Sequence, residues 1–232
     1  MPNGATCIRV GFSRIGLLVG LLGLLSGCDD SLGDTCGIQN REVTCLSVGQ
    51  IVPTSVSGEE TDEVDAIRDA CGLDLDGDGN PVVVLEPVGD HTAAITFRND
   101  VSPVGTAEDE DSSEGALLTI DNFTVSYALN RCTLATPCPI LPGFRGTQTV
   151  TVGPGEQVTQ TFALVPSNVK NAFARQVGDL EQDDVPPAGW PTYTATYRFQ
   201  VRAVLGEGSF ELVASQTFTI GNFDTCPEDT SD

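Results

Sequence analysis

Residues 193–220 read YTATYRFQVRAVLGEGSFELVASQTFTI and contain the clearest structural pattern of the chain. In the first half, apolar and polar side chains alternate, which is the period of a strand with one buried face. Residues 206–208 are a glycine-rich turn, after which the alternation resumes and only Gln216 breaks the inward row. The stretch therefore predicts an antiparallel hairpin. Its inward residues are Tyr193, Ala195, Tyr197, Phe199, Val201, Ala203, Phe210, Leu212, Phe218 and Ile220.

Other segments of the chain have the same strand character. Alternation predicts strands from His91 to Phe97 and from Phe123 to Leu129, and a continuous apolar run predicts a buried strand at residues 82–85. Residues 147–152 and 157–165 flank a Gly-Pro-Gly-Glu turn and are expected to pair with each other. Further strand character lies at residues 51–56.

Helical signals are few. Thr61 as N-cap, apolar residues at helical spacing and Gly72 as a stop predict a short helix over residues 61–71. A helical turn is expected after Ser167, as far as Phe173. About seven strands with one short helix indicate an all-β fold, an antiparallel β-sandwich with long acidic loops such as residues 100–115. The pattern of residues 82–223 resembles immunoglobulin-like (Ig-like) domains, which implies that topology.

The first 28 residues contain Arg9, Arg14, an apolar run and the sequence LSGC at positions 25–28. The 11 residues from 15 to 25 span about 16 Å as a helix, too short for a hydrocarbon core of about 30 Å. The segment suits a secretory signal. It resembles the lipobox of bacterial lipoproteins, which implies cleavage between Gly27 and Cys28 and acylation of Cys28. An ordinary N-terminal helix and a signal cut elsewhere are the alternatives.

Removal of residues 1–27 would leave 205 residues, enough for one sandwich domain. We expect a lipidated cysteine and tether at residues 28–49, a domain at 50–226 with its strand core at about 82–223, and a disordered acidic tail at 227–232. The mature chain would keep nine basic and all 33 acidic residues, a formal charge of −24. That charge disfavours nucleic acid as a partner, because polyanions are repelled.

Six cysteines remain after processing, and an even number in an exported chain indicates disulfides. They are Cys36, Cys45, Cys71, Cys132, Cys138 and Cys226. Six cysteines allow 15 pairings. We expect two local pairs, Cys36–Cys45 and Cys132–Cys138, and a long-range pair, Cys71–Cys226. Zinc is not favoured, because there is no C-x-x-C pair and one histidine only.

The turn at residues 74–80 has two interpretations. Asp74, Asp76, Asp78 and Asn80 offer the alternating oxygen ligands of the first half of an EF-hand loop, with Gly79 at the sharp turn. The second half does not match, because Leu85 stands where the bidentate glutamate belongs. The segment is either a calcium loop or an exposed acidic turn.

Two side chains, Trp190 and His91, are candidates for ligand contact or catalysis. Trp190 either stacks on a sugar ring or plugs the open end of the sandwich, and we favour the plug. His91, the one imidazole, is interpreted as a structural residue at a strand start. The chain lacks the G-x-S-x-G and P-loop motifs, and nothing around Lys170, the one lysine, indicates Schiff-base chemistry. The sequence does not favour an enzyme.

Together these features predict a membrane-anchored lipoprotein of the bacterial cell envelope with a non-enzymatic Ig-like interaction domain. The domain would lie in the periplasm or at the cell surface, and the anchoring membrane, inner or outer, stays open. The expected partner is an envelope protein or the wall, reached by strand addition at a threonine-rich edge such as residues 147–152. A calcium-dependent carbohydrate-binding or adhesion module is the alternative. A hydrolase that uses His91 is the third hypothesis.

Overall fold

The computed structural model describes residues 33–39, 42–73, 82–86, 89–102, 117–134, 137–178, 189–204 and 209–223. The predicted lipobox at residues 25–28, the predicted acidic turn at 74–80, most of the predicted loop at 100–115 and the predicted tail at 227–232 lie outside these residues. In the described part of the chain, no helix has the length and apolar character that crossing a membrane requires.

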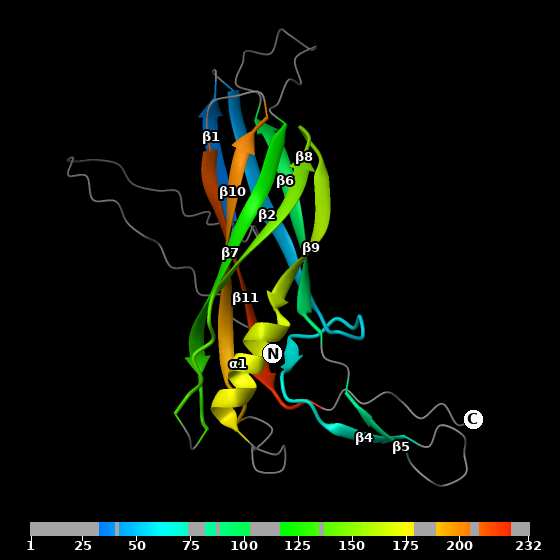
Figure 1. Cartoon of the computed structure of the whole chain (residues 1–232). Coiled ribbons are helices and arrows are strands. Elements are labelled where there is room, and N and C mark those ends of the chain that lie inside the picture. The colour runs from blue at the N-terminus through cyan, green and yellow to red at the C-terminus, as the bar shows by residue number, and fades with distance from the viewer. Residues whose placement is uncertain are drawn as a thin grey trace, which may run out of the picture.

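Two twisted sheets form the body of the molecule (Figure 1). The four-stranded sheet has the order β1 (Gly33–Gln39), β2 (Glu42–Thr54), β6 (His91–Ser102) and β9 (Gln157–Val165). The five-stranded sheet has the order β3 (Glu63–Asp65), β11 (Ser209–Gly221), β10 (Thr192–Ala203), β7 (Leu118–Arg131) and β8 (Phe144–Val152). A separate pair, β4 (Ala70–Leu73) and β5 (Val82–Leu85), projects from the lower end beside the single described helix, α1 (Ser167–Val177) (Figure 1). The all-β, sandwich-like class is confirmed.

The predicted hairpin is present as β10 and β11. Tyr193 faces Phe218 and Phe199 faces Leu212 in the antiparallel register. The side chains of the inward row of β10 are buried, as the alternation predicts. Gln216, the residue that breaks the row, stands opposite Ala195 and is only partly buried.

Aromatic rings from both sheets meet in the core. Phe97 of β6 and Phe199 of β10 pack edge to face with ring centroids 5.1 Å apart. Phe162 of β9 lies 5.1 Å from Phe123 of β7 and 5.3 Å from Phe199. Edge-to-face contacts at these distances are favourable beyond simple burial. The two sheets are therefore joined through one shared aromatic cluster.

Residues 33–49 were expected to be a tether, and this expectation was wrong. They form β1 and the first part of β2, and β2 pairs with β6 along the four-stranded sheet. Leu46 and Val48 are fully buried in the core. The Asp, Gly and Asn residues of this segment suggested loop structure, but its apolar residues find partners on strands that come later in the chain.

The helix predicted at residues 61–71 is absent. The segment contains the short strand β3, which pairs in parallel with the end of β11 and places Val64 opposite Ile220. The Thr61 hydroxyl accepts the Glu63 N–H at 3.1 Å, as a helix cap would, but here it closes a turn. Burial of Val64 beside a distant strand outweighs the local helical pattern.

The expected pairing of β8 with β9 was also wrong. Both strands exist, but β8 pairs with β7 in one sheet and β9 pairs with β6 in the other. The turn between them docks on β6, where Asn99 N donates to Glu156 O at 3.0 Å and Gly155 N donates to Asn99 O at 2.8 Å. The Gly-Pro turn therefore carries the chain from one sheet to the other.

The apolar run at residues 82–85 is a strand, β5, but not a buried one. Val83 is 71% exposed and Leu85 is 53% exposed. The reason is that β5 pairs with β4 in the small projecting sheet and takes no part in the sandwich. A continuous apolar run alone does not show whether the strand lies in the core of the sandwich or in a small sheet outside it.

Trp190 closes the lower end of the sandwich, where it is 3% exposed and its ring centroid lies 6.4 Å from that of Phe173. Gly221 lies directly against the indole, and a Cβ at this position would overlap the ring carbons Cδ2 and Cγ. The fit requires glycine at the end of β11. The structure therefore agrees with the plug interpretation.

We predict that Gly221→Ala lowers the free energy of unfolding by about 1–3 kcal/mol, because the added methyl group overpacks the site and displaces Trp190. Gly49→Ala is the matched control, because the nearest atoms to its Cβ, both of Thr96, lie at 4.0 Å. It should change stability by less than about 0.5 kcal/mol. Urea unfolding followed by tryptophan fluorescence measures both. Equal effects of the two substitutions would contradict the packing described.

Candidate functional site

The only lysine and the only histidine of the chain come together beside α1. Lys170 is 4% exposed and His91 is 1% exposed, although both are polar. Both line a cavity of about 160 Å³, together with Thr61 and Phe223. Three segments far apart in sequence therefore meet at one place: the start of β6, the residues around β3 and the helix.

The buried, mainly apolar face of helix α1 determines the position of Lys170. Val169, Phe173 and Val177 are buried on that face, and Lys170 is buried with them because it follows Val169 directly. The helix begins where Asp90 meets it, since both the backbone N–H and the hydroxyl of Ser167 donate to Asp90 Oδ1 at 2.7 Å. The helical turn expected after Ser167 is confirmed and continues to Val177.

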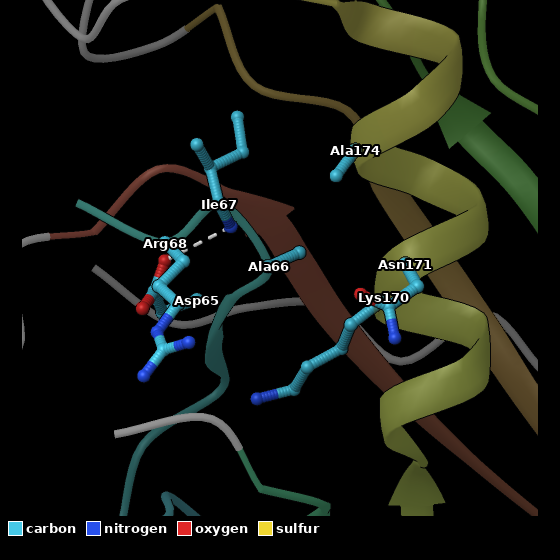
Figure 2. Close-up of a pocket in the computed structure, with 7 residues that line it drawn as sticks. All are labelled: Asp65, Ala66, Ile67, Arg68, Lys170, Asn171 and Ala174. Carbon is cyan, nitrogen blue, oxygen red and sulfur yellow. Dashed lines mark hydrogen bonds between the residues drawn. The ribbon is translucent and has the colours of Figure 1, made fainter. Parts of the chain in front are cut away.

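A second cavity, of about 230 Å³, lies between α1 and residues 65–68 and is also lined by Lys170. Figure 2 shows the Lys170 side chain extending from the helix toward this segment. Asp65 Oδ1 accepts the N–H groups of Ile67 at 3.3 Å and of Phe223 at 3.4 Å. These bonds hold the loop after β3 as one wall of the cavity.

Arg68 completes this wall. Its Nε donates to Glu86 O at 3.0 Å, and Glu86 Oε2 accepts the Asp69 N–H at 3.0 Å. Asn222 Nδ2 in turn donates to Asp69 Oδ2 at 2.7 Å. The wall is therefore tied both to the residue after β5 and to the residue after β11.

Burial controls the protonation of both basic groups. It lowers the pKa of Lys170, against the opposing effect of the Asp65 and Asp90 carboxylates. It also lowers the pKa of His91 to about 4, although the Thr61 carbonyl and Asp62 oppose this shift and the Lys170 charge adds to it. His91 is therefore neutral at pH 7, and its Nε2–H donates to Thr61 O at 3.0 Å.

The cavity between α1 and residues 65–68 has a mixed lining. Ala66, Ile67 and Ala174 supply apolar surface, whereas Lys170 and Arg68 bring positive charge into a strongly acidic protein. Among the described residues, Lys170 Nζ has no hydrogen-bond or ion-pair partner. A buried amine that faces a cavity can hold an anion when protonated, or act as a nucleophile when neutral.

The predicted cysteine framework is present in part. The disulfide Cys132–Cys138 is formed, as expected. Cys45 and Cys71 are both disulfide-bonded, and Cys36 stands opposite Cys45 in the strand register. Cys226 lies outside the described residues, and the expected pairs Cys36–Cys45 and Cys71–Cys226 stay predictions.

Most of the other predicted site residues lie outside the part of the chain that the structure describes. Gly27, Cys28, Asp74, Asp76, Asp78 and Asn80 lie outside the described residues, so the lipid and calcium interpretations stay predictions. Within the described ranges, no group of three His, Cys, Asp or Glu side chains could hold a metal ion. Trp190 is too deeply buried for a ring face to meet a sugar.

The Lys170 cavity has no counterpart among the features predicted from the sequence. The sequence predicts no role for the single lysine, and Asp65 and Arg68 fall in the predicted helix at residues 61–71, where the structure has the strand β3 and a loop. One signal was available, namely a lone lysine beside the apolar residues Val169 and Phe173 in a predicted helical turn. The opposite wall of the cavity lies next to this lysine only in the folded protein.

No protein-family model, no curated protein and no solved structure matches the chain.

We predict that His91 makes the protein less stable as the pH falls. Above pH 6.5 the imidazole is neutral in both states, whereas between pH 6.5 and about 4 the unfolded chain binds a proton that the folded protein excludes. The free energy of unfolding should therefore fall over this window by up to about 3 kcal/mol more in the wild type than in His91→Gln.

Urea unfolding of both proteins between about pH 7 and about pH 4 measures the difference. The carboxylates titrate in both proteins, so subtracting the two curves isolates the histidine. Parallel curves would show that His91 takes up its proton in the folded state.

Proposed function

We propose that the protein is a lipid-anchored lipoprotein of the bacterial cell envelope whose sandwich serves as a non-enzymatic interaction module. The lipobox at residues 25–28 supports the anchor, with Cys28 as the acylated residue. Only residues 29–32 separate Cys28 from the first strand at Gly33. Four residues reach at most about 14 Å. Acylation would therefore hold β1 and β2 against the membrane surface.

The proposal of an interaction module rests on the open edge of the five-stranded sheet. Strand β8 is the last strand of that sheet, bonded to β7 on one side and, within the described residues, to no strand on the other. Its outward side chains are exposed and hydrophilic. They are Arg145, Thr147, Thr149 and Thr151.

An edge of this kind can bind a strand from another protein. The unpaired N–H and C=O groups of an edge strand supply main-chain hydrogen bonds, and the alternating side chains supply selectivity. Among the described residues, the hydrogen bond between β8 and β9 is the one that Gln148 Nε2 donates to Thr161 O at 3.0 Å. An extended segment of an envelope protein is the partner this edge suits.

For the anchor, we predict that protein purified from membranes begins at Cys28 and carries acyl chains. Intact-mass analysis measures both the loss of residues 1–27 and the mass of the lipid. Cys28→Ala should keep the first 27 residues and lose the lipid, because it lacks the thiol that is modified. A native protein without fatty acid would contradict the proposed anchor.

For the edge, we predict that the tagged, detergent-solubilised protein captures a partner from envelope extracts and that a proline in β8 abolishes capture. Successive N–H groups of a strand point to opposite sides. One of Thr147→Pro and Gln148→Pro therefore removes an outward N–H and spares the ladder to β7. The variant that keeps the wild-type melting temperature is the one to compare.

Thr194→Ala is the matched control, because Thr194 lies on the outer face of β10, away from the edge. It should capture the partner as the wild type does. Capture that survives the folded proline variant would rule out strand addition at β8. Recovery of no partner at all would contradict the interaction module.

A further inference from the structure

The cavity between α1 and residues 65–68 has the features of a built binding site. Its lysine is 4% exposed and has no hydrogen-bond or ion-pair partner among the described residues, and the Asp65 and Asp90 carboxylates offset only part of the cost of removing its charge from water. A buried ammonium is stabilised when an anion reaches it. The cavity in front of it, about 230 Å³, has room for a small molecule.

A second cation faces the same space. Arg68 and Lys170 both line this cavity, and Figure 2 shows Arg68 on the segment opposite the helix. Arg68 uses its Nε for Glu86 O, which fixes the plane of the guanidinium and leaves its terminal nitrogens for another acceptor. A carboxylate bound in the cavity therefore has two positively charged groups in its lining.

The charges of the site select the ligand. Lys170 and Arg68 together with the Asp65 carboxylate give a formal charge of +1, which one negative charge neutralises. A dianion such as phosphate would leave excess negative charge close to Asp65 and Asp90, both of which act on Lys170. The neighbouring cavity that Lys170 also lines carries Glu59 and Glu63, which makes it unsuitable for an anion.

The uncharged part of the lining indicates the rest of the ligand. Ala66, Ile67 and Ala174 form an apolar surface beside the two cations, and Asn171 adds one amide. A short hydrocarbon chain fits such a surface, because its burial is favourable and requires no hydrogen bond. We propose that this cavity binds a short aliphatic monocarboxylate, with Lys170 and Arg68 as the cationic contacts and Ala66, Ile67 and Ala174 against its chain.

The experiment uses the one lysine of the chain as its probe. Full-length protein labelled with ¹³C,¹⁵N-lysine and purified in detergent gives a single lysine side-chain NMR signal, which belongs to Lys170. Butyrate should shift this signal with a Kd of about 1 mM, in the range expected of so small a ligand. Butyramide, the neutral isostere, should leave it in place, and phosphate should shift it less than butyrate does.

Calorimetric titration of variants tests the two contacts separately. Lys170→Met keeps the length of the side chain and should weaken butyrate binding at least tenfold, and Arg68→Gln should weaken it severalfold. Arg175→Gln is the matched control, because Arg175 is exposed on the same helix and lines neither cavity. It should bind as the wild type does.

The outcomes separate clearly. A lysine signal that butyrate does not move, equal shifts with butyrate and butyramide, or a stronger response to phosphate would overturn the proposal. So would unchanged affinity in Lys170→Met with a native circular dichroism spectrum. If Lys170→Met does not fold, Arg68→Gln and the lysine signal of the wild type decide. None of these results depends on acylation of Cys28 or on strand addition at β8.

Discussion

The contact between Phe97 and Phe199 is the constraint on which the sandwich depends, because it joins central strands of two sheets that, in the described part of the chain, share no hydrogen-bonded strand pair. Phe162 extends this contact to β9, and Phe123 extends it to β7. Each ring comes from a strand whose inward positions alternate with polar outward ones. The positions of these four rings set the spacing of the layers, and the strand ends then determine where α1 can pack.

Two tyrosine hydroxyls connect the aromatic core to the candidate site by hydrogen bonds to the end of β9. Strand β9 shifts register beside His91, and near the shift Tyr127 donates to Leu164 O at 2.6 Å and Tyr197 donates to Ala163 O at 3.0 Å. Both donors come from the opposite sheet, and burial raises the pKa of both phenols. The end of β9 is thereby fixed shortly before α1 begins, so the position of Lys170 depends on the core.

How much could be predicted from the sequence differs between strands and site. The β10–β11 hairpin was predictable because each strand buries one face and a short turn joins them. The prediction of a helix around Val64 was wrong. The apolar spacing of this segment fits a helix, but Val64 is buried beside β11, which is far away in the chain. The turn after β8 signalled a reversal but not a change of sheet. The Lys170 site was not predictable, since its two walls, residues 65–68 and α1, are far apart in the chain and have no local signal in common.

The parallel pairing of β3 with β11 has a consequence for biosynthesis. During synthesis, residues 63–65 are made long before their partners, residues 219–221. Until residues 219–221 are made, Val64 lacks the strand that lies beside it, and the wall next to α1 is incomplete. The cavity beside Lys170 therefore depends on a contact between segments far apart in the chain, and such contacts form late because a long loop must close first.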